Sequence, residues 1–131
     1  MFDLNTKILI VDDMGTMRKI VTRSCTEIGF KNFQEAADGA LAWEALNASG
    51  AGIGLVISDW NMPNCTGLDF LKRVRGDARF KTLPFILVTA EAEKGQILEA
   101  LQSGVSGYVV KPFTADILKK QLEEAYKKLK G

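Results

Sequence analysis

The stretch that decides the fold is Ile8-Leu9-Ile10-Val11-Asp12-Asp13, in which four apolar residues are followed at once by two carboxylates. An apolar run of this length suits a strand covered on both faces. Comparable runs recur at 55–57, 85–88 and 108–110, and a weaker one lies at 32–36. We therefore expect five strands in one sheet.

Segments with helical spacing alternate with these runs. The expected helices are 17–28 ended by Gly29, 40–48 behind Asp38, 68–74, 97–102 ended by Gly104, and a last one capped by Thr114 with Leu118, Leu122, Ala125 and Leu129 on one face. Five repeats of strand then helix predict an α/β fold, a parallel sheet between two helical layers with right-handed crossovers. We expect one domain over residues 1–131 and no output domain.

Composition narrows the function classes. Seventeen Lys and Arg against sixteen Asp and Glu give a net charge of +1, which provides no general attraction to nucleic acid. Histidine is absent, so metal chemistry must use oxygen ligands. Cys25 and Cys65 form no C-x-x-C pair, the start shows no secretory signal, and the longest apolar stretches have four residues. We expect free thiols in a soluble, cytoplasmic protein.

Polar residues follow the apolar runs directly: Asp12-Asp13, Ser58-Asp59, Thr89-Ala90 and Lys111-Pro112. Ligands of such sheets bind at the carboxyl ends of the strands, so these side chains should converge. Three carboxylates packed together repel one another unless a cation lies among them. Mg²⁺ is the best candidate, held by Asp12, Asp13, Asp59 and a backbone carbonyl.

Carboxylate-bound metal beside a lysine and a hydroxyl is typical of phosphoryl transfer. A carboxylate can form an acyl phosphate, and Asp59 is the candidate because it follows a middle strand with two acids beside it. Lys111 would then pair with the acceptor or the phosphoryl group, and Thr89 would donate its hydroxyl to a phosphoryl oxygen. The sequence thus predicts a phosphoacceptor site.

Four ordered motifs carry a resemblance to known proteins: Val11-Asp12-Asp13, then 58–64, 88–92 and 106–114. Together they resemble the receiver domains of response regulators, particularly the single-domain receivers of chemotaxis, over essentially the whole chain. The resemblance implies a flavodoxin-like (βα)5 sheet of order 2-1-3-4-5, phosphorylation of Asp59 by a histidine kinase, and the Asn61 carbonyl as a further Mg²⁺ ligand.

The resemblance also implies contacts from Ala90 to the phosphate, a cis Lys111–Pro112 bond, and a switch in which Thr89 and Tyr108 move together. The phosphorylated form would bind the flagellar motor switch through the face of the fourth helix, fifth strand and fifth helix. Its expected residues are Ala92, Lys94, Tyr108, Val110, Phe113, Thr114, Lys119 and Lys120. The alternative is a receiver that acts as a phosphate sink or regulates a non-motor partner. A phosphatase is a possible further partner, and we expect a monomer.

Other functions fit less well. An aspartyl-nucleophile phosphatase would place an acid two residues after its nucleophile, where this chain has Asn61. A flavin module would bind phosphate in the loop after the first strand, which here begins with two acids. A receiver that regulates an attached or separate transcription domain is a third alternative.

Single residues also have structural interpretations. Thr89 could cap a helix and Tyr108 could simply pack. We expect Trp43 and Cys25 to pack, and Trp60 to belong to a surface that reports or recognises the phosphorylation state. Cys65-Thr66 and Gly15 depart from the usual motif.

Overall fold

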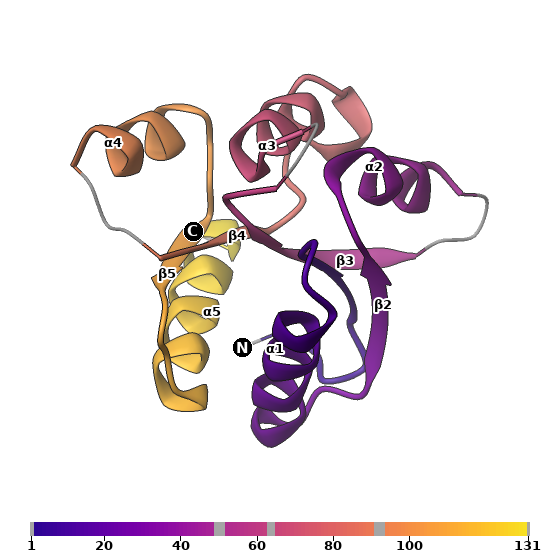
Figure 1. Cartoon of the computed structure of the whole chain (residues 1–131), viewed down its shortest axis with the longest axis vertical. Helices are drawn as coiled ribbons and strands as arrows, with labels where there is room; N and C mark the ends of the chain where they lie inside the picture. Colours follow the sequence, from indigo (N-terminus) through magenta and orange to yellow (C-terminus); the bar gives the residue numbers. More distant parts are fainter. Residues whose placement is uncertain (1, 49–51, 63–64, 91–93, 131) are drawn as a thin grey trace.

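The computed structural model describes residues 2–48, 52–62, 65–90 and 94–130. Strands and helices alternate along the chain as predicted (Figure 1). The strands are β1 Lys7–Val11, β2 Asn32–Ala36, β3 Ile53–Asp59, β4 Phe85–Thr89 and β5 Gly107–Val110. The helices are α1 Gly15–Ile28, α2 Gly39–Asn47, α3 Gly67–Arg75, α4 Lys94–Gln102 and α5 Ala115–Lys130, with a 3-10 turn η1 at Ala78–Phe80.

The five strands form one parallel sheet in the order β2-β1-β3-β4-β5, which confirms the expected topology. The order places β1 and β3 side by side in the middle of the sheet, with Val11 opposite Ser58. At the other side, Thr89 of β4 is opposite Val110 of β5. The residues that follow β1, β3 and β5 therefore leave the sheet at one edge.

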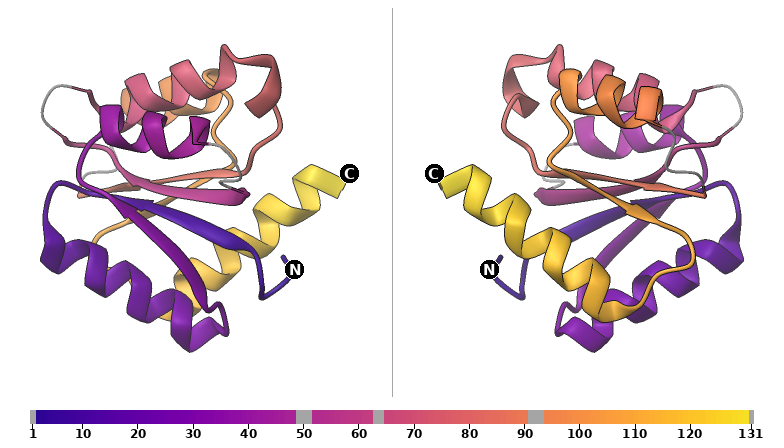
Figure 2. Two further views of the ribbon diagram at one scale, coloured as in Figure 1. Left: turned by 90° about the vertical axis from the view of Figure 1, so that its right-hand side faces the viewer. Right: turned by 90° about the vertical axis from the view of Figure 1, so that its left-hand side faces the viewer.

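Two hydrophobic cores lie on opposite faces of the sheet. Helices α2, α3 and α4 cover one face, and α1 and α5 cover the other (Figure 2). Alternate strand residues supply the two cores: Leu9 and Val11 pack under α2 and α3, whereas Ile8 and Ile10 pack under α1 and α5. Burial on both faces explains why the strands are continuous apolar runs in the sequence.

Helix ends follow the predicted signals closely. The Asp38 side chain accepts a hydrogen bond from the Leu41 amide at 2.8 Å and the Thr114 hydroxyl from the Ile117 amide at 3.3 Å. Gly29 and Gly104 both have positive φ, at 124° and 90°, where a side chain would be strained. Helix α4 begins at Lys94, three residues before the apolar spacing becomes visible.

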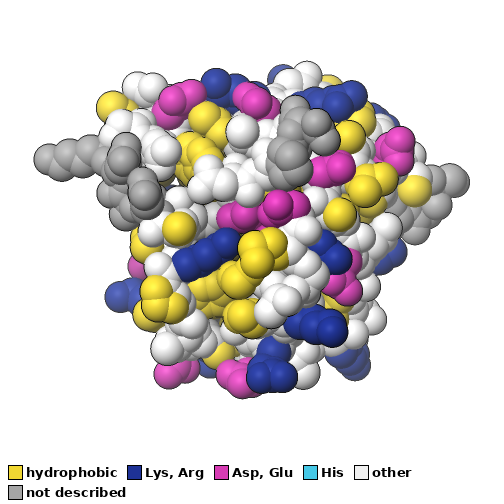
Figure 3. Space-filling model, in the orientation of Figure 1, with side chains coloured by type: hydrophobic (Ala, Val, Ile, Leu, Met, Phe, Trp, Pro, Cys, Tyr) yellow, Lys and Arg dark blue, Asp and Glu magenta, His cyan; other side chains and the backbone are white. Residues whose placement is uncertain are grey.

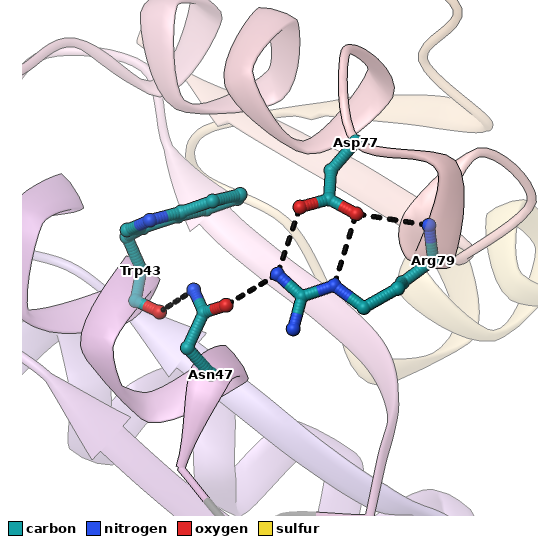
Figure 4. A network of polar contacts seen from close by, with 4 residues as sticks. All are labelled: Trp43, Asn47, Asp77 and Arg79. Atoms are coloured by element: carbon teal, nitrogen blue, oxygen red, sulfur yellow. Dashed lines mark hydrogen bonds and ion pairs between the residues drawn. The ribbon is translucent and has the colours of Figure 1, made fainter.

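The η1 turn was not predicted because three residues are too short to show a periodicity. It is held by a polar network that joins it to α2 (Figure 4). Arg79 donates to both Asp77 and the Asn47 side chain, and Asn47 donates to the Trp43 carbonyl. The Trp43 indole packs edge-to-face on Phe80, so the expectation that Trp43 packs is confirmed.

One expectation from the composition, that of free thiols, is confirmed. Cys25 and Cys65 are both free thiols. Burial raises the pKa of the Cys25 thiol to about 12, in keeping with inert packing. None of the described helices has the length and apolar character needed to cross a membrane.

The connection from β3 to α3 folds back tightly on the end of β3. The Gly67 amide donates to the Trp60 carbonyl at 2.8 Å. A Cβ on Gly67 would lie 2.1 Å from the Asp59 carbonyl oxygen, far inside van der Waals contact. Only glycine lets the first turn of α3 rest against the backbone of Asp59.

We predict that Gly67→Ala destabilises the fold by about 2–4 kcal/mol, because the added methyl group must push the backbone of β3 or α3 aside. Gly95→Ala is the matched control: a Cβ at Gly95 meets nothing within 4 Å, so alanine there should stabilise α4 by about 0.5–1 kcal/mol. Urea unfolding measures both changes. Equal effects of the two substitutions would contradict this account of the loop.

Candidate functional site

The polar residues predicted at the strand ends do converge at one edge of the sheet. Asp12 follows β1, Asp59 ends β3 and Lys111 follows β5. The Lys111 Nζ lies 3.0 Å from Asp59 Oδ1 and 3.7 Å from Asp12 Oδ2. The Lys111 ammonium group thus contacts the carboxylate of Asp59, a residue 52 positions earlier in the chain.

Three carboxylates form the centre of the site. Asp12, Asp13 and Asp59 each offer an oxygen, and these oxygens lie within 4.8 Å of one another. Asp12 and Asp59 are buried, with exposed fractions of 3% and 6%, whereas Asp13 is exposed. The space-filling view shows the face of the molecule that is turned to the reader in Figure 1. Acidic side chains gather near its middle, beside Lys or Arg side chains and an apolar area (Figure 3).

Burial raises the pKa of the Asp12 carboxyl, and the charges of Asp59 and Asp13 raise it further. The Met14 amide, which donates to Asp12 Oδ1 at 2.9 Å, and the charge of Lys111 act in the opposite direction. Burial is the largest of these effects, so the Asp12 carboxylate is costly to keep ionised unless a cation lies beside it.

The donor set fits a hard divalent cation. Three carboxylates and one ammonium leave two uncompensated negative charges, and all the donors are oxygens. Mg²⁺ prefers such ligands and keeps several waters, which suits a cluster that includes the exposed Asp13. The structure therefore brings together three of the groups expected to hold the metal, the carboxylates of Asp12, Asp13 and Asp59.

Thr89 and Tyr108 belong to the two strands at one side of the sheet and share one of its faces. Side chains alternate along β4, and the parity of Phe85 and Leu87 puts Thr89 on the side covered by α2, α3 and α4. Tyr108 packs against the same core and is opposite Leu87. Thr89 is buried and Tyr108 is half-buried. Because Tyr108 is opposite Leu87, two residues before Thr89, Tyr108 and Thr89 are diagonal neighbours on adjacent strands.

Comparison with known proteins agrees with this geometry. Residues 8–123 match the response regulator receiver domain family. The chain belongs to this family. A chemotaxis protein CheY from Pseudomonas aeruginosa is 49% identical over 125 residues, which cover 95% of this chain and 99% of that protein. A chemotaxis protein CheY-3 from Vibrio cholerae is also 49% identical, with 95% of each chain covered.

Solved structures show the same fold. The chemotaxis response regulator CheY4 of Vibrio cholerae has a TM-score of 0.80 at 34% identity, with 92% of this chain and 98% of that chain covered. A receiver domain from Clostridium thermocellum has a TM-score of 0.83 at 23% identity, covering 95% of this chain and 97% of that one. As a CheY-like receiver, the chain is a two-component signalling protein, which implies a histidine kinase upstream and a target downstream.

One expectation about the site was wrong. Trp60 is only 8% exposed and packs into the core under α2 and α3, so it is not part of an exposed recognition surface. Its amide donates to the Val88 carbonyl at 2.8 Å, which extends the β3–β4 pairing one residue beyond the strand. The chain turns away from the sheet only after Trp60, which a sequence motif alone does not reveal.

Two further residues expected at the site, Asn61 and Ala90, lie just beyond the ends of β3 and β4. Asn61 is exposed two residues beyond Asp59, and Ala90 is exposed directly after β4. The Lys111–Pro112 bond is cis, as the family resemblance implied.

The three elements expected to form the partner face, α4, β5 and α5, lie at the same side of the molecule (Figure 1). On it, Thr114, Lys119 and Lys120 are exposed, and Val110 and Phe113 are half-buried like Tyr108. Ala92 lies outside the described residues, and Lys94 is described only as the first residue of α4.

The unusual Cys65-Thr66 pair has a local explanation. The Thr66 hydroxyl caps α3 by accepting from the Asp69 amide at 3.1 Å. Cys65 packs against Gly39, where a Cβ would lie 2.6 Å from the sulfur. Thr66 therefore caps α3 and Cys65 packs against the start of α2, and neither belongs to the carboxylate cluster.

We predict that Lys111→Met lowers the free energy of unfolding by about 2 kcal/mol without divalent cations, because it leaves buried carboxylates unpaired. Adding Asp59→Asn should recover part of that loss, since it removes one of the repelling charges. Lys119→Ala, which removes an exposed lysine, should change stability by no more than about 0.5 kcal/mol. Denaturant unfolding in EDTA measures five proteins: wild type, the single variants Lys111→Met, Asp59→Asn and Lys119→Ala, and the double variant. Strictly additive effects of Lys111→Met and Asp59→Asn would refute the coupling.

Proposed function

We propose that this receiver accepts a phosphoryl group on Asp59 from a histidine kinase and, once phosphorylated, binds the flagellar motor switch to control rotation. The observation that carries the proposal is the 3.0 Å contact between Lys111 Nζ and Asp59 Oδ1 within the carboxylate cluster. The relatives named chemotaxis proteins support the assignment to motility. Such a protein would act in the cytoplasm.

The transfer step follows from the positions of the side chains. An Asp59 carboxylate oxygen attacks the phosphorus of the donor phosphohistidine, the new O–P bond forms as the N–P bond breaks, and the donor nitrogen keeps the electron pair. Lys111 Nζ contacts the free Asp59 carboxylate, and after the transfer it could pair with the phosphoryl oxygens, which then carry the negative charge. Thr89 would donate its hydroxyl to a phosphoryl oxygen, and the region of Ala90 would contact the phosphate.

Asp12, Asp13 and Asp59 would hold Mg²⁺, with the Asn61 carbonyl as a further ligand. When bound, the ion neutralises the charge that accumulates on the transferring phosphoryl group. The uncompensated charge of the cluster supports this assignment.

Signalling would use Thr89 and Tyr108. Phosphorylation adds about one negative charge and strong acceptors beside Lys111, and the Thr89 hydroxyl would move toward them. Because Tyr108 is its diagonal neighbour on the same face, it could rotate inward behind Thr89 and change the α4–β5–α5 face. A tenfold preference of the target for this state needs only about 1.4 kcal/mol.

The target contact would be made by Ala92, Lys94, Tyr108, Val110, Phe113, Thr114, Lys119 and Lys120. Exposed Leu98 and Leu101 of α4 add apolar area near this face. We propose that the receiver acts as a monomer.

We predict that acetyl phosphate and Mg²⁺ place one phosphate on the protein, stable to acid and labile to base and hydroxylamine, as an acyl phosphate should be. Asp59→Asn should abolish it, and Asp69→Asn, at an exposed acid of α3, should leave it unchanged. Radiolabelled phosphate or intact mass measures the stoichiometry. Labelling that survives in folded Asp59→Asn protein would show that another residue is the nucleophile.

We predict that Thr89→Ala still accepts phosphate but loses most of the gain in target affinity, because no hydroxyl links the phosphoryl group to Tyr108. Tyr108→Ala should weaken binding with and without phosphate. Target affinity is measured with and without beryllofluoride, a phosphoryl mimic, using the motor switch protein. An equal gain for wild type and Thr89→Ala would remove the coupling but leave the acceptor assignment intact.

A further inference from the structure

Arg18, in the first turns of α1, reaches back to the loop that carries the acidic pair. Its Nη1 donates to the backbone carbonyl of Asp12 at 2.5 Å, and its Nε donates to Glu35 Oε1 of β2 at 2.9 Å. One planar guanidinium is therefore held by two acceptors from two different elements. A fork of this kind fixes orientation better than a single flexible ammonium could.

The acceptor of the first bond is the peptide group that joins Asp12 to Asp13. The Asp12 amide donates to the Ala36 carbonyl at 3.2 Å, and its carboxylate accepts from the Met14 amide at 2.9 Å. With Arg18 on the carbonyl, the amide, carbonyl and carboxylate of Asp12 each have a fixed partner. The orientation of the Asp12–Asp13 peptide in turn sets where the Asp13 side chain leaves the backbone.

Gly15 provides the space for this arrangement. A Cβ on Gly15 would lie 3.3 Å from Arg18 Nη2, which is tighter than ordinary van der Waals contact. Because the guanidinium is tethered at both acceptors, it could not give way without lengthening one of its hydrogen bonds. The departure from the usual motif at residue 15 thus has a structural counterpart in Arg18.

We propose that Arg18 is a positioning residue for the divalent-cation site: it fixes the Asp12–Asp13 peptide so that both carboxylates face Asp59, and the absence of a side chain at Gly15 permits this. The inference rests on the proposed Mg²⁺ site and names a residue outside its ligands. Mg²⁺ tolerates little departure from octahedral geometry, so small shifts of a ligand's backbone reduce affinity.

The charge pair itself contributes little to the fold. The side chains of Arg18 and Glu35 are 21% and 52% exposed, and ion pairs with such access to water add little stability. The effect of Arg18 should therefore appear in metal affinity rather than in unfolding. That difference separates positioning from a merely structural role.

The test is a Mg²⁺ titration followed by the fluorescence of Trp60, in a Trp43→Phe background. Arg18→Ala should weaken Mg²⁺ binding by about tenfold. The phosphorylation rate at saturating Mg²⁺ should stay within about twofold of wild type, since Arg18 touches no reacting group. Arg23→Ala removes an exposed arginine from the same helix and should leave Mg²⁺ affinity unchanged, which controls for net charge.

Gly15→Ala is the second variant, and it keeps Arg18. Alanine favours a helix more than glycine does, so the unfolding midpoint should be unchanged or higher. Mg²⁺ affinity should nevertheless fall, by less than in Arg18→Ala, and the Gly15→Ala effect should vanish when Arg18 is already alanine. If Arg18→Ala does not fold, the Mg²⁺ affinity of Gly15→Ala alone tests the positioning role of Arg18.

Wild-type Mg²⁺ affinity in both Arg18→Ala and Gly15→Ala would overturn the positioning role while leaving the proposed function intact. A wild-type protein that accepts phosphate without any Mg²⁺ response would instead overturn the metal site, and the inference with it. Loss of affinity in Arg18→Ala with an equal loss in Arg23→Ala would assign the effect to charge alone and overturn the role of the peptide contact.

Discussion

The structure depends on one electrostatic constraint: three carboxylates share one edge of the sheet with a single ammonium group. Lys111 bridges Asp59 and Asp12 at 3.0 and 3.7 Å, and two negative charges stay uncompensated. Repulsion of this kind costs stability, and the surrounding chain holds the acids in place against it. The site is thereby suited to a divalent cation, whose two positive charges would balance the two negative ones.

The scaffold supplies that restraint from several sides. The Asp59 backbone pairs with Val88 of β4, the preceding Ser58 pairs with Val11 of β1, and Asp59 lies directly under Gly67. The Asp12 backbone is tied to β2 through Ala36 and to α1 through Arg18. The backbones of Asp59 and Asp12 are thus tied to neighbouring strands and helices, while Thr89 and Tyr108 lie on β4 and β5, beside the α4–β5–α5 face.

The sequence predicts most of this arrangement because its signals are local. Apolar runs locate the strands, caps such as Asp38 and Thr114 locate helix starts, and the polar residues after the runs locate the site. The expected sheet order came from resemblance, since no local pattern determines which strands are neighbours. The burial of Trp60 and the role of Arg18 could not be predicted, because both depend on contacts between elements far apart in the chain.

The most direct test of the central claim is to locate the phosphoryl group after transfer from the phosphorylated histidine of the kinase. Borohydride reduces an acyl phosphate to the alcohol, so tandem mass spectrometry of the reduced protein marks the acceptor as homoserine. The account predicts homoserine at residue 59 and at neither Asp12 nor Asp13, with little transfer when Mg²⁺ is removed by EDTA. Homoserine at Asp12 or Asp13, or equal transfer without the metal, would contradict it.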